Sequence, residues 1–125
     1  MEKLEIFFNR RSIREFKDQR IDNEAIEQLL KAAMYAPSAM NRQPWHFVVV
    51  EARETMERIM EIHAHARMLT TASHAIIVCG DEQLQHDDGY WVVDCGAATQ
   101  NLLLAATQLG LGSCWVGLHP REERK

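Results

Sequence analysis

Apolar residues recur along this chain with two spacings, and each spacing predicts one type of element. Helical spacing, with apolar side chains every three or four residues, runs through residues 2–9, 23–35 and 52–69. Two short runs rich in β-branched side chains, residues 45–50 and 75–80, predict strands. With 125 residues and no internal repeat or linker, the chain is expected to form a single domain over residues 1–125.

Several residues mark where these elements begin and end. Asp22 is a suitable N-cap for the helix from Asn23 to about Tyr35, and Pro37 ends that helix. Residues 81–89 are polar, rich in acidic side chains and histidine, and predict a loop. Residues 113–118 predict a short strand or an extended turn.

The last third of the chain has an unusual pattern, because it lacks a charged face. Between Gly89 and Pro120 there is no lysine or arginine, and Asp94 is the only formal charge. Asp94 is predicted to cap a helix that runs to about Leu109, with Gly110 as its stop signal. A helix without a solvated side is expected to be buried all round, which a homodimer would achieve most simply.

Composition narrows the class of protein. The formal charge of −4 argues against a general nucleic-acid binder, and the polar residues of the uncharged helix argue against a membrane span. The first residues lack the layout of a secretory signal, so a cytoplasmic location is expected. Cys79, Cys95 and Cys114 are widely spaced in apolar runs and are predicted to be reduced and buried.

Residues 37–47, between the second helix and the first strand, are the most informative stretch. Ser38, Asn41 and Gln43 are uncharged hydrogen-bonding side chains on a segment that Pro37 and Pro44 restrain. Such a loop beside a core strand suits a planar, heteroatom-rich ligand such as a flavin ring. An ordinary helix-to-strand connection is the alternative.

Residues 10–14, Arg-Arg-Ser-Ile-Arg, form the best candidate anion site. If this segment is helical, Arg10 and Arg14 share a face, and Ser12 adds a hydroxyl donor. Guanidinium groups match phosphate oxygens in bidentate fashion, so a phosphate monoester is the expected ligand. A solvated basic patch is the alternative.

Other kinds of site find little support. His63 and His65 fall near the end of a helical pattern, where their side chains diverge, and no second ligand pair follows at zinc-finger spacing, so no metal is expected. Cys114 has apolar neighbours and no nearby base, which favours an inert core thiol. No catalytic side chain is identified. An anion clamp and a polar cradle without acid–base machinery favour a bound cofactor that supplies the chemistry.

Four segments in order resemble the nitroreductase family of FMN-dependent oxidoreductases. Residues 10–14 with Phe16 look like its N-terminal phosphate motif, and residues 36–47 are similar to its most recognisable segment. Residues 67–80 match the next segment, and residues 94–117 resemble the central dimer helix and the turn after it. The resemblance therefore covers nearly the whole chain.

The resemblance implies an α+β fold with a mostly antiparallel central sheet flanked by helices. It also implies a homodimer with FMN at the subunit interface. The cofactor-binding residues that it implies are Arg10, Arg11, Ser12, Arg14, Pro37, Ser38, Asn41, Gln43, Arg67, Val116 and Gly117.

These residues divide by implied role. The arginine segment with Ser12 would hold the phosphate and ribityl chain of FMN, whereas Pro37, Ser38 and Asn41 would reach FMN from the partner subunit and Gln43 would support the polar edge of the ring. Arg67 would lie near the pyrimidine end, where a cation stabilises the reduced ring. Backbone N–H groups near Val116 and Gly117 would face flavin N5.

The implied activity is hydride transfer from NAD(P)H through flavin N5 to a nitroaromatic, quinone or similar small acceptor, by a ping-pong mechanism. Residues 120–125 read as the opening of a further helix, so the chain is expected to lack the usual C-terminal segment. The alternative function is therefore an FMN-binding module with little or no turnover. A divergent reductive dehalogenase or flavin-fragmenting relative, and a structural protein without cofactor, are further alternatives.

Overall fold

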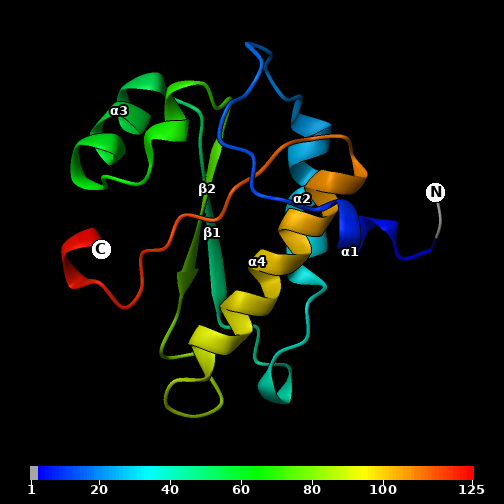
Figure 1. Ribbon diagram of the computed structural model, residues 1–125. Helices are drawn as coiled ribbons and strands as arrows, with labels where there is room; N and C mark the ends of the chain where they lie inside the picture. The colour runs from blue at the N-terminus through cyan, green and yellow to red at the C-terminus, as the bar shows by residue number, and fades with distance from the viewer. Residues whose placement is uncertain (1–2) are drawn as a thin grey trace.

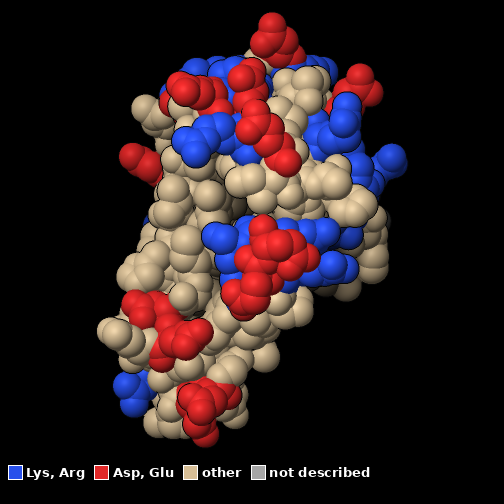
Figure 2. Space-filling view, turned by 90° about the vertical axis from the view of Figure 1, so that its left-hand side faces the viewer, with Lys and Arg blue, Asp and Glu red and all other residues tan. Residues whose placement is uncertain are grey.

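The computed structural model describes residues 3–125 as helices packed around a small sheet (Figure 1). Strands β1 (Trp45–Val50) and β2 (Ala75–Gly80) pair antiparallel, in a register that sets Trp45 opposite Gly80 and Val50 opposite Ala75. Both lie where their β-branched runs predicted them. Figure 2 shows the face formed by α3 (Arg53–Ile62) and the C-terminal segment, where Lys and Arg are interspersed with Asp and Glu.

Helices α2 (Asn23–Met34) and α4 (Tyr90–Gln108) pack against each other beside the sheet (Figure 1). Their small and aromatic side chains share buried clusters with β1, through Ala33, Trp45 and Ala98. On the other side of the sheet, Met56 of α3 packs with Val50 of β1. Helices α2 and α4 therefore cover one face of the sheet, whereas α3 packs only at the Val50 end of the other face, where Val48 stays exposed.

The ends of α2 follow their sequence signals. The Asp22 carboxylate accepts a hydrogen bond of 2.8 Å from the backbone N–H of Ala25, which confirms Asp22 as the N-cap. The helix ends at Met34, with Tyr35 in the C-cap position. The prediction for this element is confirmed to within one residue.

The predicted start of α4 is wrong. The helix begins at Tyr90, behind Gly89 with a φ of 88°, so Asp94 lies inside the helix and does not cap it. The predicted stop is confirmed: Gly110 has a φ of 76°, its N–H donates to Thr107, and the next N–H, that of Leu111, donates to Ala106. This pair of bonds is the Schellman arrangement that a C-terminal glycine permits.

The expectation that α4 is buried all round is wrong within the single chain. Val93 is 69% exposed, and Tyr90 and Val92 are also exposed, because α2 and the sheet cover only one side of the helix. The homodimer that this pattern suggested stays a prediction. None of the helices in residues 3–125 is long and apolar enough to cross a membrane.

Three other predicted elements differ in extent. The first helix, α1 (Glu5–Asn9), is shorter than predicted, and residue 2 of that prediction lies outside the described residues. The helix predicted over residues 52–69 divides into α3 and the 3₁₀ helix η2 (Arg67–Thr70). Residues 113–118 form no regular strand and make a single parallel bridge, between Ser113 and Ser12.

Candidate functional site

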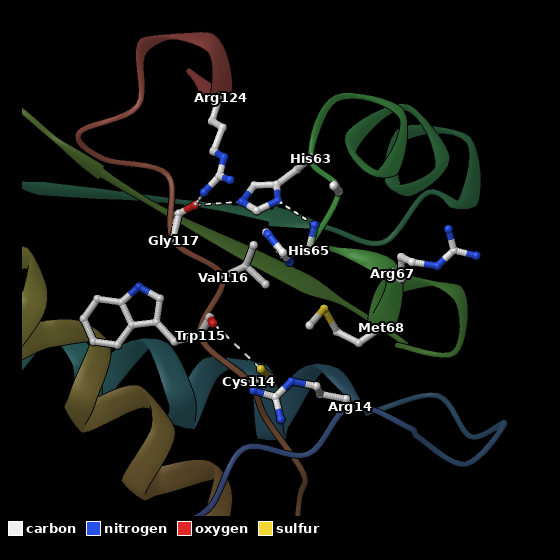
Figure 3. A pocket seen from close by; sticks show the side chains of 11 residues that line it. Arg14, His63, His65, Arg67, Met68, Cys114, Trp115, Val116, Gly117 and Arg124 are labelled. Atoms are coloured by element: carbon white, nitrogen blue, oxygen red, sulfur yellow. Dashed lines mark hydrogen bonds between the residues drawn. The ribbon is translucent and has the colours of Figure 1, made fainter.

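A pocket of about 610 Å³ lies where three segments distant in sequence meet (Figure 3). We call it the arginine pocket, because three guanidinium groups line it and no acidic side chain does. Its lining residues are Arg14, His63, Ala64, His65, Arg67, Met68, Cys114, Trp115, Val116, Gly117 and Arg124. The pocket is therefore positively charged, which favours an anionic ligand.

The arginine segment enters this pocket in an extended conformation, not as a helix. Helix α1 ends at Asn9, and Arg10 is already extended, with φ and ψ of −62° and 129°. The predicted helical pairing of Arg10 and Arg14 on one face is therefore wrong. A hydrogen bond of 2.9 Å from the Ile13 N–H to the Ser113 carbonyl fixes the segment instead, so its position depends on a distant part of the chain.

Of the four predicted residues in residues 10–14, only Arg14 lines the pocket. In Figure 3 its side chain reaches toward Cys114, whereas the Arg67 guanidinium extends away from the centre of the view. Arg11 and Ser12 are exposed, and Arg10 is half-buried at the end of α1. The pocket therefore unites Arg14 and Arg67 across 53 residues of sequence, which no local pattern could show.

His63 is the most buried polar residue of this region, with 2% exposure. Its Nε2 lies 2.7 Å from the carbonyl oxygen of Gly117, and its Nδ1 accepts a hydrogen bond of 3.1 Å from the His65 N–H. These partners require a neutral imidazole with the proton on Nε2, since a carbonyl accepts and an N–H donates. His63 thereby ties the wall at Gly117 to the end of α3.

Val116 and Gly117 present backbone groups to the pocket. Among residues 3–125, no acceptor pairs with the N–H of either residue. A Cβ added at Gly117 would meet no atom within 4 Å. Two unpaired N–H groups beside open space suit an electron-rich ligand atom. The Gly117 carbonyl, by contrast, is held by His63 and, at 3.3 Å, by the Arg124 guanidinium.

Residues 37–43, which we call the polar loop, hold the other four predicted residues. Met40, Asn41 and Gln43 all have φ values near 53°, a left-handed conformation that L residues seldom adopt. The Ser38 hydroxyl oxygen accepts from the Gln43 N–H at 2.9 Å, and the Gln43 side-chain amide donates to Asn41 at 2.8 Å. The loop is therefore braced by its own side chains, whereas the sequence predicted the two prolines as the restraint and these side chains as hydrogen-bonding groups for a ligand.

The polar loop contributes nothing to the arginine pocket of the same chain. It lies at the lower end of α4 in Figure 1, and neither Pro37, Ser38, Asn41 nor Gln43 is among the lining residues. The structure thus brings together Arg14, Arg67, Val116 and Gly117, and leaves the loop apart. This separation is compatible with the implied role of the loop toward a partner subunit.

Sequence reasoning missed six pocket residues and misjudged a seventh. It considers His63 and His65 only as metal ligands and assigns no role to Ala64, Met68, Trp115 and Arg124. Cys114, predicted to be a buried core thiol, is half-buried and lines the pocket, and Cys79 is also only half-buried, so burial is confirmed for Cys95 alone. The missed residues share only one feature in the sequence, which is that they lie near Arg67 or Gly117, and this feature is too general to identify pocket residues.

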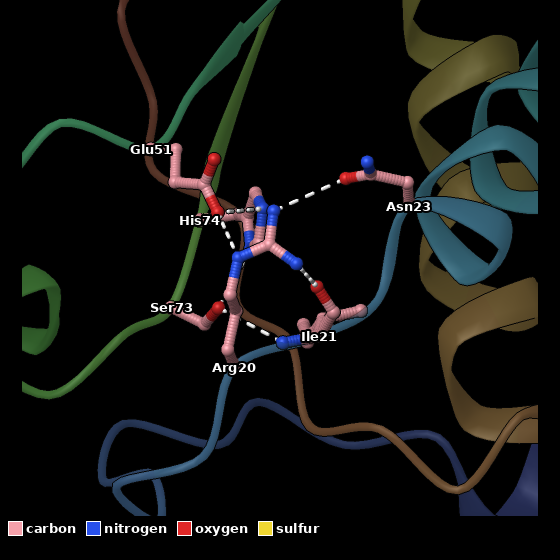
Figure 4. A network of polar contacts seen from close by, with 6 residues as sticks. All are labelled: Arg20, Ile21, Asn23, Glu51, Ser73 and His74. Atoms are coloured by element: carbon pink, nitrogen blue, oxygen red, sulfur yellow. Dashed lines mark hydrogen bonds and ion pairs between the residues drawn. The ribbon is translucent and has the colours of Figure 1, made fainter.

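A polar network lies beside a second hollow of about 460 Å³ (Figure 4). Arg20 contacts the carboxylate of Glu51, which raises the pKa of Arg20 and lowers that of Glu51. His74 lies 3.3 Å from the same carboxylate and 2.7 Å from the Ser73 hydroxyl, whose oxygen accepts from the Ile21 N–H. The network ties the segment after the arginines to the start of β2.

No cluster of three or more histidine, cysteine or acidic side chains that could hold a metal ion exists among residues 3–125. The arginine pocket therefore offers a ligand three kinds of group: cationic side chains, backbone N–H groups, and the aromatic and thioether side chains of Trp115 and Met68. Such a set binds and polarises an anionic, planar molecule but offers no evident nucleophile–base pair.

Known proteins resemble this chain along nearly its whole length. The model of the nitroreductase family matches residues 8–70 and 63–124. A protein of Archaeoglobus fulgidus with the provisional name NADH dehydrogenase/NAD(P)H nitroreductase is 52% identical over 97% of this chain and 70% of its own length. A protein of the same name from Methanothermobacter thermautotrophicus is 48% identical over 99% of this chain and 65% of its own.

A crystal structure of a provisionally assigned nitroreductase from Desulfovibrio desulfuricans, solved in complex with FMN, superposes with a TM-score of 0.87. It is 32% identical, and the match covers 94% of this chain and 69% of that one. The chain belongs to the nitroreductase family, and its α+β fold is the fold of that family. It spans about two thirds of the length of these relatives.

Proposed function

We propose that this member of the nitroreductase family binds FMN in the arginine pocket and transfers electrons from NAD(P)H to a small acceptor. The observation that carries the proposal is the pocket itself, which unites Arg14, Arg67 and the free N–H groups of Val116 and Gly117. The Desulfovibrio desulfuricans protein binds FMN, and the Archaeoglobus fulgidus protein is named for NAD(P)H and nitro compounds. Both support the same assignment.

The residues present fit the chemistry of FMN. Guanidinium groups without competing carboxylates suit a phosphate and the negative charge of a reduced flavin ring, and the open space at Gly117 admits a planar group close to the backbone. When bound, FMN would accept a hydride and pass two electrons to a second molecule, in two successive half-reactions.

The chain's own residues bind, orient and stabilise charge. Arg14 would hold the phosphate from inside the pocket. Arg10 and Ser12, with Arg11 assisting, lie outside the lining and would contact the phosphate and ribityl chain from the adjoining segment. Arg67 would stabilise negative charge that develops on the ring. The N–H groups of Val116 and Gly117 would orient the reacting edge. No side chain is assigned as a general acid or base, because solvent can supply the protons.

We assign the polar loop to a second FMN site, on a partner copy of the chain. Pro37, Ser38 and Asn41 would contact that FMN, and Gln43 would support the polar edge of its ring. The separation of the loop from the arginine pocket and the uncovered side of α4 both support this arrangement. Nitroaromatics and quinones are the proposed acceptors, since both are flat enough to stack on a flavin.

The test is an FMN titration of the double variant Arg10→Ala, Arg14→Ala against the unchanged chain. Loss of two charge-assisted phosphate contacts is expected to weaken FMN binding at least 100-fold, by roughly 1.5–3 kcal/mol per contact. The matched control is Lys17→Ala with Arg58→Ala, which removes the same charge from exposed positions. Equal affinity in the two double variants would contradict the assignment.

A visible spectrum distinguishes the reductase from a binding module. The FMN-loaded chain is expected to bleach on anaerobic addition of NADPH or NADH and to recover its yellow colour with a quinone. A loaded chain that stays yellow with both reductants would instead support the binding module without turnover.

A further inference from the structure

Asp94 is the only described side chain with a fully buried polar atom that lacks a hydrogen-bond partner. The residue is 4% exposed and lies in the second turn of α4. Its Oδ1 accepts a hydrogen bond of 3.2 Å from the Ala39 N–H, whereas no donor reaches Oδ2. Burying a carboxylate with one partner costs free energy, so an apolar side chain would suit the core better.

The bond from Asp94 reaches the polar loop at its centre. Ala39 begins the short 3₁₀ turn η1 (Ala39–Asn41), directly after Ser38 and before the left-handed residue Met40. Left-handed L residues persist only where their surroundings hold them. The other braces of the loop, from Ser38 to Gln43 and from Gln43 to Asn41, are internal to it. Asp94 therefore provides the tie between this turn and the core.

The next residue of α4 contacts Pro44, which directly follows the polar loop. The Cys95 thiol lies 3.7 Å from the Pro44 carbonyl oxygen, to which it donates. Burial raises the pKa of Cys95 to about 11, so this thiol keeps its proton at neutral pH. Two successive residues of α4 thus hold the middle of the polar loop and the residue that follows it, which fixes where the outer side chains of the loop point.

We propose that Asp94 is a positioning residue for the cofactor: it holds the polar loop in the conformation that displays Ser38 and Asn41. The inference rests on the proposed function, because display matters only if the loop meets FMN. Asp94 acts through Ala39 and does not touch the cofactor. An oxygen acceptor is retained at this buried position for the hydrogen bond, which explains an acidic side chain inside a helix that has no other charged residue.

The first experiment compares Asp94→Ala with Asp94→Asn. The alanine variant removes the acceptor for the Ala39 N–H, whereas the asparagine variant keeps an oxygen there. We expect FMN affinity to fall about tenfold in Asp94→Ala and to recover to within about threefold in Asp94→Asn, as the loss of one hydrogen bond to a charged group implies. Thr107→Ala is the matched control, since Thr107 donates only within α4, to Leu103.

The second measurement is amide hydrogen exchange of residues 38–43 in the chain without FMN. Exchange is expected to rise at least tenfold in Asp94→Ala and to stay unchanged in Thr107→Ala. A merely structural role would instead raise exchange throughout α4. This readout needs no cofactor, so it tests the positioning of the loop even if the proposed function fails.

Ala39→Pro breaks the same hydrogen bond from the loop side. Proline lacks the N–H but is tolerated at the first residue of a helical turn, after an extended residue such as Ser38. If Asp94→Ala does not fold, Ala39→Pro gives the same test. If both fold, the effects of the two changes on exchange should be strongly non-additive.

The outcomes separate the two proposals. Unchanged exchange in Asp94→Ala or, if that variant does not fold, in Ala39→Pro would overturn the positioning role. Faster exchange with unchanged FMN affinity, in a chain that binds FMN, would also overturn it, because the loop would then be irrelevant to the cofactor. If exchange is faster in Asp94→Ala but the unchanged chain binds no FMN, the result would support the role of Asp94 in holding the loop and contradict the proposed function.

Discussion

The arginine pocket and the polar loop both carry residues that the sequence marked as cofactor-binding, yet they are built differently. The pocket is assembled from segments that lie far apart in sequence, and its geometry depends on long-range bonds such as that of His63 to Gly117. The loop is continuous in sequence, holds itself through side chains of Ser38 and Gln43, and lines neither the arginine pocket nor the second hollow beside Arg20 and Glu51.

This difference predicts which property a substitution in each region will change, ligand affinity or stability. A pocket made by tertiary contacts loses ligand affinity when one wall changes, even if the fold survives. A strained loop stores conformational free energy, so changes there alter stability first and function through the direction in which side chains point. The two regions can therefore be separated experimentally by comparing effects on binding with effects on unfolding.

The largest contrast is expected between two cysteines, one in each region. Cys95 lies behind the polar loop, and with a pKa of about 11 only about one thiol in a thousand is ionised at pH 8. Cys114 is half-buried in the pocket. At pH 8 we expect iodoacetamide to label Cys114 at least 100-fold faster, as measured by mass spectrometry of peptides.

FMN is expected to protect Cys114 and to leave the slow labelling of Cys95 unchanged. Because deprotonation is what limits Cys95, its labelling rate should rise with pH up to about pH 11. Equal labelling of the two thiols at pH 8 would contradict the difference in burial between the regions.

The next largest effect is expected for Arg67→Ala. Loss of a cation beside the developing charge is predicted to slow flavin reduction by NADPH about tenfold while the Kd for FMN changes less than threefold. Stopped-flow absorbance measures the first quantity and fluorescence titration the second. Arg58→Ala, an exposed change on α3, is the control, and an equal loss in both quantities would rule out this role.

Alanine substitutions at Gly117 and Gly80 compare the effect of an added Cβ in the pocket with its effect in the core. A Cβ at Gly117 meets nothing, so Gly117→Ala should weaken FMN binding about tenfold by filling the pocket, without lowering the melting temperature. A Cβ at Gly80 would lie 2.0 Å from the Trp91 ring, so Gly80→Ala should cost about 1–3 kcal/mol of stability. A drop in melting temperature for Gly117→Ala would show that its wall is structural.

The smallest effect is expected in the polar loop. Met40 is 72% exposed with a φ of 53°, so Met40→Gly removes strain that exceeds the entropy cost of glycine. We expect a gain of about 0.5 kcal/mol, or about 2 °C in melting temperature by calorimetry. Gln28→Gly, at an exposed position inside α2, should instead lose about 1 kcal/mol. The same sign for both would mean that the loop is not strained.

Local sequence signals predicted the elements whose ends depend on nearest neighbours. The β-branched runs located both strands, and Asp22 and Gly110 marked helix ends, because capping is a contact between residues a few positions apart. The prediction for Asp94 as a cap was wrong because tertiary packing, not a local contact, decides where α4 begins. The preference of Asp94 for a helix start is weak beside the burial of the preceding turn, where Trp91 packs against the core formed by α2 and β1.

The sequence by itself determined the family, the cationic and polar residues available for a cofactor, and the helix in which Asp94 is the only charged residue. Each of these depends only on the types of residue and their order along the chain. Tertiary structure alone decided that Arg14, Arg67 and Gly117 line one pocket, that Arg10 lies extended, and that Asp94 accepts a hydrogen bond from Ala39. The physical reason is that these pairings are set by how α4 and the sheet pack. Packing sums many weak contacts over distant residues, and no local pattern encodes that sum.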